Sequence, residues 1–250
     1  MSIYLALDTS ICGLAMGLFE HSVTTPTPHL LWSHVHREAQ GSAQLITKTF
    51  LDGLNVARCK ENDIAGIVIG QGPGSFTGIR VGIAFAAGLQ GGFSRTPPPI
   101  IGVSALQIFA LRAHCQPQSE PAVPLTMETL AVLPGTRTTG YVAVVRNDIN
   151  CKVLPLDLEE AASGEWALRG EPVPKTARFL LCGDWPEFER FVGVQGTVNR
   201  LEIAAVAEQA LYGMGEHVGK VDWGRGVQML PEPLYLRRST VEERLERGGN

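Results

Sequence analysis

The residues I-A-G-I-V-I-G-Q-G-P-G-S-F-T-G-I-R, positions 64–80, join a continuous apolar run to a glycine-rich turn. A short apolar run bounded by glycine is typical of a strand that is buried on both faces. Ser75 is a residue type that caps helices, and we expect a helix from about Ser75 to Gln90, where Gly91 and Gly92 end it. The free N–H groups at the start of such a helix can bind an anion. The stretch therefore predicts a strand, a turn and a helix of an α/β fold.

Three well-known glycine motifs do not fit this turn. A phosphate-binding P-loop needs Lys after its last glycine, and here Ile79 follows Gly78. Thr77 stands where a dinucleotide-binding turn needs its third glycine, and the next strand lacks a terminal acid for a ribose. Pro73 occupies the first glycine position of a nucleophile elbow. Neither a Rossmann oxidoreductase nor a serine hydrolase is supported.

The elements around this unit predict a ribonuclease-H-like half. Three apolar runs with turns between them indicate an antiparallel meander: Ile3–Leu7, Gly13–Phe19 and Leu30–Val35. Apolar residues three or four apart then predict an amphipathic helix: Ala43, Ile46, Phe50, Leu54 and Ala57. After the glycine unit come a strand at Ile100–Val103 and a helix capped by Ser104.

Two ribonuclease-H-like halves make up the α/β fold of the actin/Hsp70 ATPases, which we expect here. We place the first half at residues 1–106 and a diverged, degenerate second half at 107–250. The second half contains a linker or loop at 116–124. Its other predicted elements are a hairpin, a strand and a helix: Tyr141–Val145 with Cys151–Leu156, Phe179–Cys182 and Leu201–Met214.

Composition limits the partners and the compartment. A net charge of −4, with no basic run except Arg237-Arg238, argues against strong tRNA binding by this chain alone. The five cysteines are scattered without a C-x-x-C pair, which fits a reducing cytoplasm and argues against a zinc module. No stretch approaches the apolar length of a membrane span, and Asp8 interrupts the only candidate for a signal peptide.

The glycine helix has a face nearly without side chains, because Gly78, Gly82 and Ala86 fall four residues apart. Another backbone can approach such a face closely. That backbone belongs either to the chain's own domain, with Arg80 pointing to water, or to a partner. We expect the partner surface or motif to comprise Gly72, Pro73, Gly74, Ser75, Phe76, Gly78, Arg80 and Gly82.

Asp8, Thr9 and Ser10 end the first strand, where actin-like ATPases place an acid near phosphate and metal. Two readings stay open: a nucleotide site, or an Asp8 carboxylate that accepts bonds from the N–H groups of its own turn. A nucleotide site needs a second phosphate loop, and neither Gly135 nor Gly183-Asp184 has the required pattern. No base is placed to activate Thr9 or Ser10 as a nucleophile. We expect no catalytic residue, no resident cofactor and at most weak binding of ATP or ADP.

The histidines at 29, 34 and 36 cluster on one predicted strand and are the strongest candidates for a metal site. His34 and His36 share a strand face, but only Glu38 lies near them at ligand spacing, and no helical H-x-x-x-H pair exists. We expect no metal and interpret these side chains as solvent-facing.

The glycine motif, residues 70–82, resembles the signature of the TsaB family. Three shorter stretches are similar to the family's opening strand, a later strand with its cap, and its C-terminal E-P-[VL]-Y-L-R: Leu5–Ser10, Ile101–Leu106 and Glu232–Arg237. Two family segments differ. Gly41 stands where relatives carry a histidine before the first long helix, and residues 133–141 lack both acids of the family's D-A-R-x-x-[EQ] segment.

The resemblance implies an accessory, non-catalytic subunit with a helical partner surface in its N-terminal half. The partner is TsaD, the transferase that forms N6-threonylcarbamoyladenosine beside the tRNA anticodon, joined by the ATPase TsaE. It also implies that tRNA is contacted only through this complex, and that the chain forms a homodimer when alone. The alternative is a weak actin/Hsp70-like ATPase, and the residues do not support the peptidase activity once ascribed to such proteins.

Overall fold

The computed structural model describes most of the chain. The described residues are 1–22, 24, 27–36, 41–93, 96–115, 129–145, 151–162, 167–168, 171–172, 178–192, 197–221, 223 and 230–234. The predicted linker at 116–124, Glu38, and the end of the C-terminal motif with Arg237-Arg238 lie outside these residues. Among the described residues, no helix is long and apolar enough to cross a membrane.

The first sheet has the strand order β3-β2-β1-β4-β5. Strand β1 pairs antiparallel with β2 and parallel with β4, so the meander and the later strands meet at β1. Its strands are β1 (Ser2–Asp8), β2 (Leu14–His21), β3 (His29–His36), β4 (Ile64–Gly70) and β5 (Ile100–Val103). This is the predicted ribonuclease-H-like order.

The second sheet repeats that order as β8-β7-β6-β11-β12, again with two antiparallel and two parallel pairings. Its strands are β6 (Thr129–Pro134), β7 (Thr139–Val145), β8 (Cys151–Asp157), β11 (Arg178–Cys182) and β12 (Thr197–Leu201), with a separate pair β9 (Ala167–Leu168) and β10 (Glu171–Pro172). The sheet of the half that we expected to be degenerate is therefore complete. The reduction lies in its outer helices, α4 (Leu158–Ala162) and α5 (Pro186–Val192), which are short.

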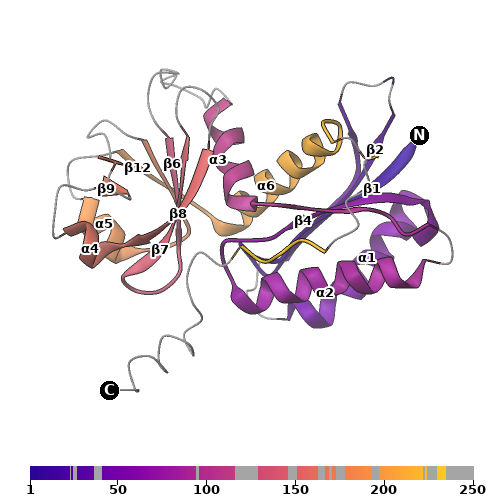
Figure 1. Ribbon diagram of the computed structural model, residues 1–250, viewed down its shortest axis with the longest axis horizontal. Helices are drawn as coiled ribbons and strands as arrows, with labels where there is room; N and C mark the ends of the chain where they lie inside the picture. The colour runs from indigo at the N-terminus through magenta and orange to yellow at the C-terminus, as the bar shows by residue number, and fades with distance from the viewer. Residues whose placement is uncertain are drawn as a thin grey trace.

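The longer helices cover and join the sheets (Figure 1). Helices α1 (Ser42–Ala57) and α2 (Phe76–Gly92) pack side by side on the outer face of the first sheet, and a 3-10 turn, η1 (Glu61–Asp63), precedes β4. Helices α3 (Ala105–Cys115) and α6 (Ile203–Val218) lie against each other between the two sheets. Helix α3 packs on the second sheet, whereas α6 packs on the first, so each half supplies a helix to the other.

Three apolar clusters hold these layers together. One lies under α1 and α2 and contains Leu5, Ile67 and Phe50, and another lies under α4 and α5 and contains Phe188. The third lies between the sheets, around α3 and α6. Burying one large apolar side chain contributes about 1.5–3 kcal/mol. The many apolar residues of the central cluster therefore stabilise the packing of the two halves against each other. Our domain boundary at residue 106 remains a proposal, because the apolar packing of the central cluster continues across it.

Candidate functional site at the glycine turn

The glycine motif forms the predicted turn and helix. The turn begins at Gly70, the last residue of β4, and ends at Gly74. Ser75 then caps α2 by accepting a hydrogen bond from the N–H of Gly78, with Oγ and N 3.1 Å apart. Gly72 and Gly74 have φ angles of 105° and 146°, which residues with a side chain rarely adopt. Two of the glycines are therefore required by the shape of the turn itself.

The turn and the start of α2 contact the residues that follow β1 at backbone distance. The N–H of Ser75 donates to the carbonyl oxygen of Ser10 at 2.8 Å, and the hydroxyl of Thr9 donates to the carbonyl oxygen of Gly78 at 2.7 Å. A methyl group on Gly74 or Gly78 would overlap the backbone of Ser10 or Thr9. We call this set of contacts the glycine contact. It explains why the motif is rich in glycine without any bound ligand.

Asp8 lies beneath this contact and is fully buried. Its Oδ2 accepts from the N–H groups of Ser10 at 3.2 Å and Ile11 at 3.1 Å, and its Oδ1 accepts from the Ser10 hydroxyl at 2.6 Å. A side chain on Gly70 would collide with the same carboxylate. Of our two readings of Asp8, the structure confirms the bonds to the N–H groups of its own turn.

Burial controls the ionisation of this site. Desolvation raises the pKa of Asp8, although the three hydrogen bonds act in the opposite direction. Burial and the nearby Asp8 charge raise the pKa of the Cys12 thiol to about 12. A thiol with a pKa this high is protonated at neutral pH, which argues against a nucleophilic role for Cys12.

The predicted partner face on α2 is internal in the folded chain. Gly78, Gly82 and Ala86 are buried, and a Cβ on Gly82 would lie 2.5 Å from the Thr9 hydroxyl oxygen. The expectation that Gly78 and Gly82 present a free surface is therefore wrong, because the chain's own turn occupies that face. Gly72 and Pro73 are also buried, Gly74 and Phe76 are half-buried, and Ser75 and Arg80 are exposed.

Arg80 extends over the ring of Phe76, with its guanidinium carbon 3.8 Å from the ring centroid. Stacking of this kind on an exposed helix contributes about 0.5–1 kcal/mol. The exposed part of the motif is therefore the first turn of α2 rather than its glycine face.

In the second half, the turn between β6 and β7 corresponds to the turn that follows β1. Its backbone N–H groups bond to acceptors within the turn itself. The N–H groups of Gly135 and Thr136 both donate to the carbonyl oxygen of Thr139, at 3.0 and 2.8 Å. The indole N–H of Trp185 donates to the carbonyl oxygen of Arg137 at 2.7 Å. The segment 133–141, which lacks the acids found in relatives, thus forms a closed hairpin turn whose first amides already have acceptors.

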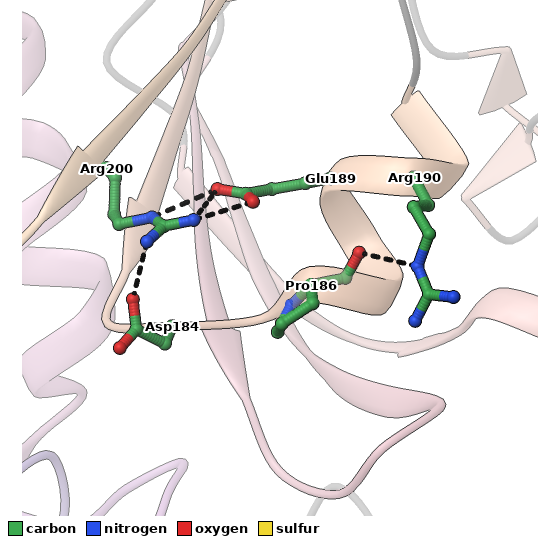
Figure 2. A network of polar contacts seen from close by, with 5 residues as sticks. All are labelled: Asp184, Pro186, Glu189, Arg190 and Arg200. Atoms are coloured by element: carbon green, nitrogen blue, oxygen red, sulfur yellow. Dashed lines mark hydrogen bonds and ion pairs between the residues drawn. The ribbon is translucent and has the colours of Figure 1, made fainter.

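Gly183 and Asp184, our other candidate for a second phosphate loop, follow β11. Figure 2 shows the Asp184 carboxylate bonded to Arg200 of β12, which also contacts Glu189 of α5. The Arg200–Asp184 distance is 2.9 Å, and hydrogen bonding to Glu189 raises the pKa of Arg200. In this arrangement Asp184 takes part in a surface ion-pair network.

The histidines of β3 lie on an edge strand of the first sheet, and Glu38, the acid at ligand spacing from them, lies outside the described residues. His29 and His34 are exposed, and His34 stacks on Trp32 with the ring centroids 6.3 Å apart. Within the described part of the chain, no three His, Cys, Asp or Glu side chains are grouped as metal ligands.

A cleft of about 390 Å³ opens beside the glycine contact. Its walls come from the turn after β1, the first residues of α1 and the first residues of α2. Gly41, which replaces the histidine of relatives, lies in this wall and caps α1 with a φ angle of 97°. Sequence reasoning did not predict the cleft, because residues 9–13, 41–44 and 75–81 are far apart in the chain.

The four stretches that resemble one family meet at this end of the first sheet. The ends of β1, β4 and β5 carry the first three, and the N–H of Leu234 in the fourth donates to the carbonyl oxygen of Gln71 at 2.7 Å. The described part of the C-terminal motif, residues 232–234, thus lies against the glycine turn. Sequence analysis found each stretch but not this meeting point.

Comparisons with known proteins agree with this picture. Residues 37–143 match the family described as TsaD: tRNA N6-adenosine threonylcarbamoyltransferase. Over 106 residues the chain is 32% identical to the tRNA threonylcarbamoyladenosine biosynthesis protein TsaB of Escherichia coli, covering 42% of each protein. It is 29% identical over 152 residues to the uncharacterized protein ML0378 of Mycobacterium leprae, covering 60% of this chain and 37% of that protein. These matches thus span about two fifths of the length of each curated relative.

Two solved structures share the fold over nearly the whole chain. YeaZ from Pseudomonas aeruginosa is 22% identical with a TM-score of 0.63, covering 94% of this chain and all of YeaZ. An uncharacterized Pseudomonas aeruginosa protein with similarity to peptidase YeaZ is 21% identical with a TM-score of 0.62, covering 95% and 100% of the two chains. With the glycine motif and the actin-like pair of sheets, these findings show that the chain is a homologue of TsaB (YeaZ).

Proposed function

We propose that this chain is a non-catalytic scaffold subunit that pairs with a TsaD-like transferase to form N6-threonylcarbamoyladenosine beside the tRNA anticodon. The observation that carries the proposal is the glycine contact. Where an actin-like enzyme would hold a phosphate, the backbones of Ser10 and Ser75 are bonded to each other, and Asp8 is surrounded by its own turn. Because these polar groups are already bonded within the chain, the region favours a structural role over a catalytic one.

The surface that we propose for the partner is the outer side of α1 with the first turn of α2. Four large apolar residues are exposed among the described residues, and two of them are on α1: Leu51 with 44% and Val56 with 64% of its surface accessible. Exposed apolar side chains gathered on one element mark interaction sites more often than scattered ones do. Ser75 and Arg80, at the first turn of α2, are exposed as well.

The remaining partners follow from the same proposal. A TsaE-like ATPase joins the complex, and a homodimer through the same surface forms when the transferase is absent. The net charge of −4 leaves tRNA contact to the other subunits. The assembly works in the cytoplasm, where tRNA is modified.

The test is binding to the TsaD-like transferase of the same organism, measured by co-purification and calorimetry. We expect Leu51→Glu with Val56→Glu to abolish binding while the thermal unfolding midpoint stays within a few degrees of that of the wild type. Lys152→Glu is the matched control, because it changes the net charge by the same two units at an exposed position of β8, in the second sheet. Normal binding by the α1 variant would refute the proposed surface, and failure of the wild-type chain to bind would refute the function.

The alternative function is weak nucleotide binding, which the cleft beside the glycine contact favours. Its walls include the starts of two helices, where N–H groups and the helix dipole attract anions. Thermal unfolding with and without ATP and magnesium separates the alternatives. We expect no shift of the midpoint, and a shift of several degrees that saturates with ATP would favour the alternative.

A further inference from the structure

Two described parts of the chain after α6, Trp223 and residues 230–234, contact the first sheet at glycine positions. The ring of Trp223 lies against Gly66 of β4 and is 4.8 Å from the ring of Tyr4, measured between centroids. Its indole N–H donates to the carbonyl oxygen of Val218 at 3.0 Å, which fixes it to the end of α6. Trp223 thereby packs on the face of the first sheet that looks toward the second half.

Residues 230–234 contact the other end of the sheet. A Cβ on Gly102 of the edge strand β5 would overlap the ring of Pro231 and the side chain of Gln71. The N–H of Leu234 donates to the carbonyl oxygen of Gln71, and the carbonyl oxygen of Leu234 lies 3.3 Å from the place of a Cβ on Gly72. Both glycines leave room for this segment, and Figure 1 shows it running beside β4 and α2.

Gln71 connects the segment to the glycine contact. Its own N–H donates to the carbonyl oxygen of Val103 at 2.9 Å, so this one residue of the glycine turn bonds to both the edge strand and the C-terminal segment. Four residues later, the N–H of Ser75 bonds to Ser10. Gln71 is thus separated by only three residues from the amide that bonds to Ser10.

We propose that residues 230–234 form a strap that holds the glycine turn in the shape from which α2 begins. Release of the strap loosens the glycine contact without unfolding the sheet. A binding partner that draws the C-terminal segment away would thus act on the start of α2 from a distance. This inference concerns the chain alone and does not depend on the proposed function.

The test is amide hydrogen exchange on the full chain carrying Gly102→Ala. The added methyl group displaces Pro231, whose ring cannot rotate away as the end of the Gln71 side chain can. The readout is the amide of Ser75, because it bonds to Ser10 and not to the strap. We expect its exchange to quicken by about tenfold while the amides within α1 keep their rates.

Gly91→Ala is the matched control, because nothing lies within 4 Å of a Cβ at that position. If Gly102→Ala does not fold, Pro231→Gly loosens the strap without adding bulk and is measured instead. Selective quickening at Ser75 supports the strap. Unchanged exchange at Ser75, or equal quickening throughout the chain, would overturn it.

Discussion

The two halves of the molecule share one strand order but stabilise their first hairpin turns differently. In the first half, the turn after β1 has a buried carboxylate beneath it and contacts the glycine turn through backbone atoms. In the second half, the turn after β6 bonds to itself and to one indole N–H. The comparison teaches that a shared topology does not require a shared sequence. A turn that depends on distant backbone needs particular glycines, whereas a turn that satisfies its own amides tolerates divergence.

The largest expected effect comes from bulk within the glycine contact. Gly82→Leu places a side chain where the Thr9 hydroxyl oxygen is 2.5 Å from the new Cβ. Overpacking commonly costs about 1–3 kcal/mol, and here we expect more than about 3 kcal/mol or loss of the folded protein. Urea unfolding is the measurement. Gly88→Leu in the same helix meets nothing within 4 Å and should be neutral or stabilising by up to about 1 kcal/mol. Equal stabilities of the two variants would remove the basis of the comparison.

Substitution of Asp8 tests how much the buried carboxylate stabilises the turn after β1. Asp8→Ala leaves two buried N–H groups without an acceptor, so we expect a loss of about 1–3 kcal/mol in unfolding free energy. Asp8→Asn keeps one acceptor and should lose less.

The pH dependence of Asp8 has a definite sign. Burial raises the folded-state pKa of this carboxyl above its usual value of 3.8. The folded protein therefore binds the proton more tightly than the unfolded chain does, and this contribution to stability is lost as pH rises from 3.8 through the folded pKa. We expect the wild type to gain stability relative to Asp8→Asn as pH falls toward 4, measured by urea unfolding at several pH values. A relative gain as pH rises would show that the hydrogen bonds outweigh burial.

A smaller effect is expected from the second turn. Trp185→Phe removes the N–H that donates to Arg137 but keeps an aromatic ring beside Phe188. We expect a loss of about 1–2 kcal/mol in urea unfolding, from one hydrogen bond and some packing. A loss as large as that of Gly82→Leu would mean that the second turn depends on distant contacts as much as the first does.

The smallest effect is expected at the ion-pair network of Figure 2. Arg200, Asp184 and Glu189 lie at the surface of the second half, where water and salt weaken charge interactions. Arg200→Ala should leave the thermal unfolding midpoint within a degree or two of that of the wild type, in low salt and in high salt. A clear loss that disappears in high salt would show that this network stabilises the second half.

Sequence reasoning predicted most of the first half because its signals are local. The apolar run that forms β4, the cap at Ser75 and the spacing of Ile46, Phe50 and Leu54 each reflect neighbouring residues. It missed β6 and β12 in the second half. Strand β6 contains the apolar run Leu130–Leu133, a signal of the same kind as that of β4, but it is shorter and ends in Pro134. Strand β12 carries Asn199 and Arg200 on an edge and has no clear apolar alternation. Helices α4 and α5 are too short to show a helical period.

The site was predicted in part, for a similar reason. The four-residue spacing of Gly78, Gly82 and Ala86 indicated close backbone approach, and that is confirmed. It did not indicate which backbone approaches, because Thr9 lies 69 residues from Gly78 and meets it only in the folded chain. The contact of Leu234 with Gln71 was beyond sequence reasoning for the same reason.

The glycine motif forms an internal contact, and we predict that this contact, rather than a ligand, satisfies its amides. Amide hydrogen exchange at Ser75, followed by nuclear magnetic resonance with and without ATP and magnesium, tests it most directly. Because this N–H already bonds to Ser10, we predict slow exchange in the free chain and the same rate when nucleotide is added. Fast exchange in the free chain that slows on addition of ATP and magnesium would contradict this prediction. The amide would then lack an acceptor in the free chain and donate to a phosphate of the bound nucleotide.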